Sequence, residues 1–88
     1  MNIQLNVPLQ TDLGIILVTK VLNGDTVKYR FNICGDIATI NAITVRKHGA
    51  IKALDHLRRR AYRENNQIQY KKYEKMVSIL LGLQEVAA

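Results

Sequence analysis

Two runs rich in β-branched residues flank the dipeptide Asn23-Gly24, and this arrangement constrains the fold more than any other feature of the sequence. Asn and Gly both tolerate the positive φ angles of a type I′ turn, which joins two antiparallel strands through two residues. Residues 15–22 are rich in Ile, Val and Thr, and residues 26–33 alternate between apolar and polar side chains. We therefore predict a β-hairpin over residues 15–33.

Further strands are predicted on both sides of this hairpin. Residues 2–7 alternate without a break until Pro8, which removes a backbone donor and ends the run. Residues 37–43 are open to two interpretations, because their isoleucines are spaced as in a helix while their Thr and Ile content favours a strand, which we prefer. The first half is thus predicted as a three- or four-stranded antiparallel meander, with a small open barrel as the alternative form.

A long helix is predicted from residue 45 to residue 64, which contain no Pro, with Thr44 as its N-cap. Gly49 is unfavourable inside a helix, so the helix can instead begin near Ala50 and leave residues 44–48 as a basic connector. At 100° per residue, four apolar side chains fall on one stripe that is expected to face the core: Ala50, Leu54, Leu57 and Ala61.

A second helix follows the turn-forming residues Asn65-Asn66-Gln67. Gly82 favours an end of this helix before a short tail. Its apolar stripe comprises five residues: Tyr73, Met76, Val77, Leu80 and Leu83. The predicted fold class is therefore α+β, with the antiparallel meander followed by a C-terminal helical hairpin.

The chain has 88 residues, which is enough for one hydrophobic core. We therefore expect a single domain over residues 1–88, with a β-rich half at 1–43 and a basic helical half at 44–88. A core of this size supplies roughly 3 to 5 kcal/mol of net stability, so self-association is expected to add to it. Ile79 and Leu81 lie off the main stripe of the second helix and would suit a homodimer surface.

Positive charge is confined to the second half of the chain. Residues 1–43 hold three Lys and Arg side chains against three Asp, whereas residues 44–88 hold ten against four Asp and Glu. The second half therefore accounts for the whole formal net charge of +6. Such asymmetry indicates a partner that is either a polyanion or an acidic protein surface.

The candidate binding residues lie mainly on the first predicted helix. Spacings of four, three and four place Lys52, His56, Arg59 and Arg63 in a line opposite the apolar stripe. Arginine matches phosphate oxygens in bidentate geometry, although a solvated helix face would show the same pattern. The predicted anion-binding or nucleic-acid-binding residues are Arg46, Lys47, Lys52, His56, Arg58, Arg59, Arg60 and Arg63. A mixture of aromatic and basic residues adds four possible secondary contacts: Tyr70, Lys71, Lys72 and Lys75.

These patterns predict a small non-enzymatic binding protein, nucleic-acid-associated or regulatory, that contacts phosphates through a basic helix face. The alternative is an adaptor or inhibitor that binds an acidic surface on a larger protein. His48 and His56 are eight residues apart without Glu or Cys at ligand spacing, and Cys34 suits a small apolar role. No nucleophile, base and orienting group can be assembled, so we expect no enzyme activity, no metal and no cofactor.

The sequence also carries expectations about location. A lone Cys34 cannot form an intramolecular disulfide, which favours a reducing compartment. The first residues show no basic stretch followed by an apolar run. The longest apolar run after Gly14 covers residues 15–18, far short of the roughly 20 residues that a bilayer requires. We expect a cytoplasmic protein with no membrane segment.

Overall fold

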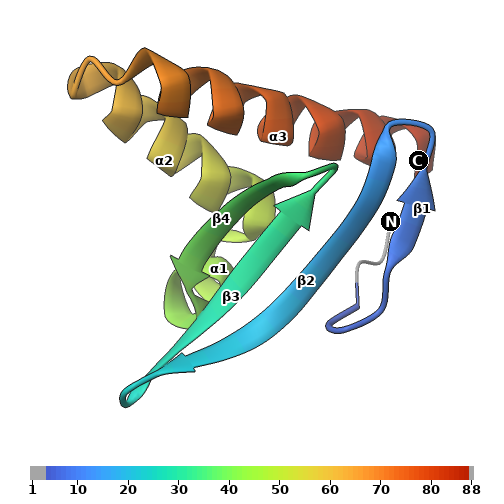
Figure 1. The fold of residues 1–88 in the computed structure, drawn as a ribbon, viewed down its shortest axis with the longest axis horizontal. Coiled ribbons are helices and arrows are strands. Elements are labelled where there is room, and N and C mark those ends of the chain that lie inside the picture. Colours follow the sequence, from blue (N-terminus) through green and yellow to red (C-terminus); the bar gives the residue numbers. More distant parts are fainter. Residues whose placement is uncertain (1–3, 88) are drawn as a thin grey trace. The chain divides into compact units, whose positions relative to one another are not determined.

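Four antiparallel strands in chain order form one open sheet in the computed structural model, which describes residues 4–87 (Figure 1). The strands are β1 (Leu9–Thr11), β2 (Gly14–Asn23), β3 (Thr26–Ile33) and β4 (Asp36–Asn41). Helices α1 (Ala42–His48), α2 (Ala50–Arg63) and α3 (Gln67–Ala87) follow them. The predicted α+β meander with a C-terminal helical hairpin is confirmed, in its four-stranded, open form.

Strand register separates the two faces of the sheet. Ile16 on β2 lies opposite Ile33 on β3, and Val18 lies opposite Phe31, which in turn pairs with Ala38 on β4. All five side chains are buried. The alternation predicted for residues 26–33 is confirmed, because the apolar members of β3 share one face of the pleat.

The predicted hairpin between β2 and β3 is confirmed, but its turn differs from the prediction. Asn23 pairs with Thr26, so the loop is Gly24-Asp25, and of these two only Gly24 has a positive φ. A type I′ turn requires positive φ at both central residues, so the predicted turn type is wrong. The β3–β4 turn meets that requirement, because Cys34 has φ 52° and Gly35 has φ 97°.

The strand predicted at residues 2–7 is wrong for residues 4–7, and residues 2 and 3 lie outside the described part of the chain. Leu5 makes only an isolated bridge with Val18, and the first strand begins after Pro8. The reason is local turn closure: the hydroxyl of Thr11 donates to the Gly14 carbonyl at 2.6 Å and accepts from a backbone N–H in the same turn. This turn selects Leu9–Thr11 as the partner of β2.

Helix α1 replaces the end of the predicted fourth strand and the start of the predicted long helix. The strand preferred for residues 37–43 is confirmed only to Asn41, whose side-chain oxygen accepts from the Ile43 N–H at 2.9 Å. Asn41 rather than Thr44 therefore caps the first helix. Gly49, with φ 85°, separates α1 from α2, so the continuous helix over 45–64 is wrong and the alternative start at Ala50 is confirmed.

The reversal between α2 and α3 is built on two asparagines. Asn65 adopts φ 56°, and its N–H donates to the Tyr62 carbonyl at 3.1 Å. The Asn66 N–H donates to the Ala61 carbonyl at 2.9 Å, which completes a Schellman motif at the end of α2. The Asn66 side chain then accepts from the Gln69 N–H at 3.1 Å and so caps the start of α3.

The apolar stripes of both helices are confirmed at their central residues, since Leu54, Met76 and Leu80 are fully buried. Ile79 is also buried, so the part of the predicted dimer surface that rests on Ile79 is wrong, whereas Leu81 is exposed. Helix α3 continues through Gly82 to Ala87, so the predicted helix end is also wrong.

Backbone contacts divide the chain into two compact units, one that ends at Lys47 and one that begins at His48. The first unit extends beyond the predicted β-rich half at 1–43 because it contains nearly all of α1. The single domain over residues 1–88 stays a prediction.

Two glycines with open space around their Cα atoms provide a test of the backbone geometry. An added Cβ would meet nothing within 4 Å at Gly35 or at Gly82. Gly35→Ala should lower the free energy of unfolding by at least about 1 kcal/mol, because φ is positive there. Gly82→Ala should raise it by up to about 1 kcal/mol, because Ala is the better helix former. Urea unfolding monitored by circular dichroism measures both, and shifts of the same sign would contradict this assignment.

Candidate functional site

A line of exposed side chains runs along the outer face of α2, and we call Lys52, His56, Arg59 and Arg63 the α2 ridge. Helical geometry places these four residues within an arc of about 60° and spreads them over about 16 Å of the axis. All four are exposed, whereas Leu54 and Ala61 on the opposite side are buried. The predicted ridge is therefore present as a continuous surface of α2.

The two carboxylates close to this helix engage three of its arginines. Asp55 pairs with Arg58 at 2.6 Å and with Arg59 at 3.1 Å, and Glu64 pairs with Arg60 at 3.5 Å. Arg59 is 71% exposed and Arg60 is 65% exposed, so their pairs contribute little to stability and exchange easily with another anion.

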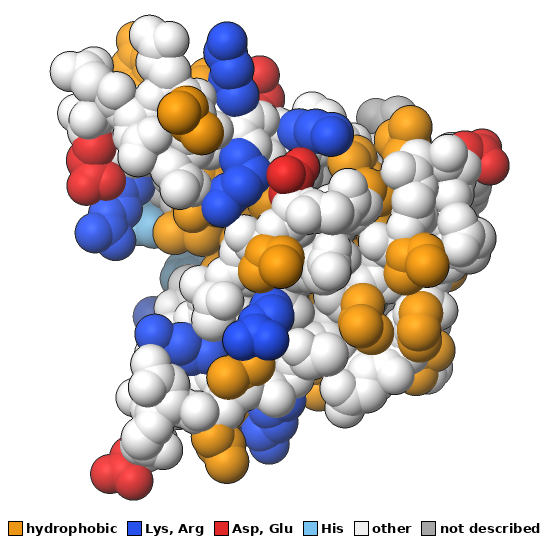
Figure 2. Space-filling view, viewed as in Figure 1, with side chains coloured by type: hydrophobic (Ala, Val, Ile, Leu, Met, Phe, Trp, Pro, Cys, Tyr) orange, Lys and Arg blue, Asp and Glu red, His pale blue; other side chains and the backbone are white. Residues whose placement is uncertain are grey.

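Lys52 and Arg63 make no ion pair within residues 4–87. Their positive charges are therefore not neutralised by neighbouring side chains. Figure 2 shows Lys and Arg side chains standing out from the surface over α2 and α3, some beside a carboxylate and others alone.

Arg58 differs from the rest of the predicted set because it braces the hairpin. Its guanidinium donates to Asp55 at 2.8 Å and to the Tyr70 hydroxyl at 3.3 Å, and it lies 5.7 Å from the Tyr70 ring centroid. The hydrogen bond with Asp55 raises the pKa of Arg58 above its ordinary value. Arg58 therefore stays charged and stabilises the fold at every pH below the ordinary arginine pKa.

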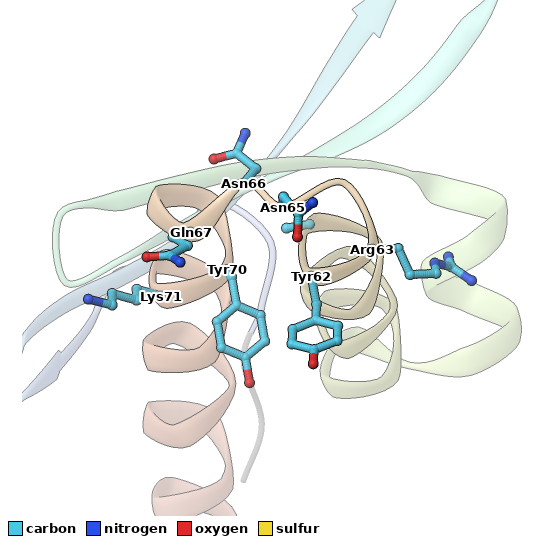
Figure 3. Close-up of a pocket in the computed structure, with 8 residues that line it drawn as sticks. Tyr62, Arg63, Asn65, Asn66, Gln67, Tyr70 and Lys71 are labelled. Atoms are coloured by element: carbon cyan, nitrogen blue, oxygen red, sulfur yellow. The ribbon is translucent and has the colours of Figure 1, made fainter.

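A recess of about 510 Å³ lies at the tip of the hairpin, where α2 ends and α3 begins. Figure 3 shows Tyr62 and Tyr70 side by side, with Arg63 and Lys71 extending away on opposite sides and the asparagines at the turn. The two rings are 5.7 Å apart at 53°. The recess is lined by Ala61, Tyr62, Arg63, Asn65, Asn66, Gln67, Tyr70 and Lys71.

Only part of the predicted residue set comes together at this recess, namely Arg63, Tyr70 and Lys71. Lys72 instead lies 4.8 Å from the Tyr73 ring centroid, and Lys75 is an exposed residue of α3.

Arg46 and Lys47 lie on α1, in the unit that contains the sheet. The Arg46 guanidinium is 6.0 Å from the Tyr29 ring centroid, which links α1 to β3. Both residues are exposed.

Sequence reasoning gave Tyr62 little weight and did not include the amides of Asn65, Asn66 and Gln67. The two tyrosines are eight residues apart across a turn, and helix periodicity within one helix cannot relate them. The signal that could have identified the site is the pair of consecutive asparagines, which favours a tight reversal and brings the flanking aromatic residues together.

Comparisons with protein-family models, curated proteins and solved structures found no match. Among residues 4–87, no helix is both long enough and apolar enough to cross a bilayer. In the same part of the chain, no three His, Cys, Asp or Glu side chains form a cluster that could hold a metal ion. Function is therefore inferred from the arrangement of this chain's own residues.

The brace between Arg58 and Tyr70 can be tested with two conservative variants. Tyr70→Phe removes the acceptor of the Arg58 hydrogen bond and should lower the free energy of unfolding by about 0.5 to 1 kcal/mol. Tyr62→Phe is the matched control, because the Tyr62 side chain is 70% exposed and its hydroxyl has no partner among the described residues; its effect should stay below about 0.5 kcal/mol. Equal losses in urea unfolding would argue against the brace.

Proposed function

We propose that this protein is a non-enzymatic nucleic-acid-binding protein that contacts phosphates through the α2 ridge. The observation that carries the proposal is the exposure of the ridge cations while the carboxylates nearby are engaged by other arginines. A helix face with uncompensated positive charge along about 16 Å attracts a polyanion with regularly spaced phosphates. Binding of this kind releases counterions and is largely independent of nucleotide sequence.

The helical unit is suited to this role because its fold does not depend on the ridge. Lys52 and Arg63 lie opposite the buried side chains of α2, and no cap of the helix uses them. The chain therefore keeps these charges in water until an anion binds. Arg59 can exchange its exposed pair with Asp55 for a phosphate at small cost.

An adaptor that binds an acidic protein surface is the second candidate function, and one observation favours it. Leu17 and Ile37 both pair with Asn32, so the register places all three on one face of the sheet. Ile37 is 48% exposed and Leu17 is half-buried. This apolar row is a surface that a protein partner could cover, and the test below separates the two functions.

The test compares two triple variants with the same loss of charge. Lys52→Gln, Arg59→Gln and Arg63→Gln together should weaken binding to DNA or RNA and reduce the slope of log affinity against log salt by roughly two to three units. Replacing Lys20, Lys28 and Arg30 of the sheet by Gln is the control and should leave the slope unchanged. Fluorescence anisotropy over a range of salt concentrations measures both, and thermal unfolding checks that each variant folds.

Two outcomes would contradict the proposal. Equal slopes for the two variants would assign binding to net charge rather than to the ridge. If the parent protein binds neither single-stranded nor duplex DNA or RNA at low salt, the nucleic-acid function is wrong and the adaptor function becomes the one to pursue.

A further inference from the structure

The tip of the helical hairpin holds an exposed aromatic ring in a fixed orientation. Tyr62 is 70% exposed, yet the Tyr70 ring supports it at 5.7 Å, and Tyr70 is itself held by the Arg58 guanidinium. An exposed aromatic side chain fixed in this way loses little conformational entropy when a flat ligand stacks on it. The solvent-facing side of Tyr62 is therefore a preformed stacking surface.

The rings do not form a slot. At 53° to each other they leave no pair of parallel faces between which a flat ligand could insert. One face of Tyr70 is already occupied by Arg58. A flat group would therefore stack on Tyr62 from the solvent side, with Tyr70 as the support behind it.

Polar groups with unused hydrogen-bonding capacity surround this surface. The side chains of Asn65 and Gln67 make no hydrogen bond with described residues, and the Asn66 amide uses only its oxygen, to cap α3. Donors and acceptors of this kind suit the edge of a nucleobase. The recess volume, about 510 Å³, lies within the range of small-molecule sites.

Positive charge flanks the tyrosine pair on both sides. Arg63 extends away from α2 and Lys71 from α3, in opposite directions (Figure 3). Neither has an ion pair within residues 4–87. A chain that places a base on Tyr62 would thus have cations on each side of that base, as a polynucleotide backbone requires.

We infer that the recess binds an unpaired nucleobase of single-stranded DNA or RNA, which stacks on Tyr62 while Arg63 and Lys71 contact the phosphates on either side. This inference rests on the proposed function and assigns its substrate class. Bases in a duplex are already stacked and cannot offer a face to Tyr62, so the recess favours single strands over duplexes.

The experiment compares Tyr62→Ala with Tyr62→Phe. Tyr62→Ala should weaken binding to a short oligothymidine by about 5- to 150-fold, the range that the loss of one stacked base produces. Tyr62→Phe keeps the aromatic face and should bind within about twofold of the parent. The salt slope should be the same for all three proteins, because no charge changes. Affinity for duplex DNA should also be equal for all three.

A second measurement uses the parent protein alone. An oligomer of the same length that carries abasic sites keeps the phosphates and removes the bases, so the parent should bind it about as weakly as Tyr62→Ala binds oligothymidine. This comparison does not depend on the folding of a variant, and circular dichroism checks the variants.

The outcomes separate this inference from the proposed function. If Tyr62→Ala and the abasic oligomer both bind like their parents while the ridge variant loses binding, the recess does not bind a base and the proposed function stands. If the parent binds no nucleic acid at low salt, both are wrong. If duplex binding falls with single-strand binding in Tyr62→Ala, the preference for an unpaired base is overturned.

Discussion

The reversal at Asn65-Asn66 is the constraint on which the helical unit and its candidate site depend. The first four N–H groups and the last four carbonyls of any helix lack partners within it, and a tight turn leaves few residues to satisfy them. Here Asn65 in the left-handed region closes α2 through two backbone bonds, and the Asn66 side chain caps α3. Because the turn is so short, residues on each side of it meet, and Tyr62 contacts Tyr70.

Electrostatics then divides the arginines of α2 between structure and surface. Asp55 accepts from Arg58, which reaches Tyr70 on α3 and joins the two helices. Arg59 shares the same carboxylate but points outward and is mostly exposed. One carboxylate thus fixes a brace on the inner side while its outer pair is weak enough to yield to another anion. The run Arg58-Arg59-Arg60 is consequently not one uniform basic patch.

Much of the fold could be predicted because its signals are local. The alternation of residues 26–33 and the stripe through Leu54 and Ala61 repeat with the period of the element, so each run specifies its own buried face. The errors occurred where pairing or turn closure decides. Residues 4–7 alternate like a strand but are not one, and Asn23-Gly24 marks a hairpin whose positive φ angle is at Gly24 alone.

By itself, the sequence determined the element types, the two faces of each helix and the line of cations along α2, because helical spacing alone places Lys52, His56, Arg59 and Arg63 together. Only the tertiary structure decided which charges stay available and where an aromatic surface forms. The bond from Arg58 to Tyr70 and the contact of Tyr62 with Tyr70 join residues on different helices. No periodicity within one helix encodes such contacts, since they depend on how tightly the backbone reverses at Asn65 and Asn66.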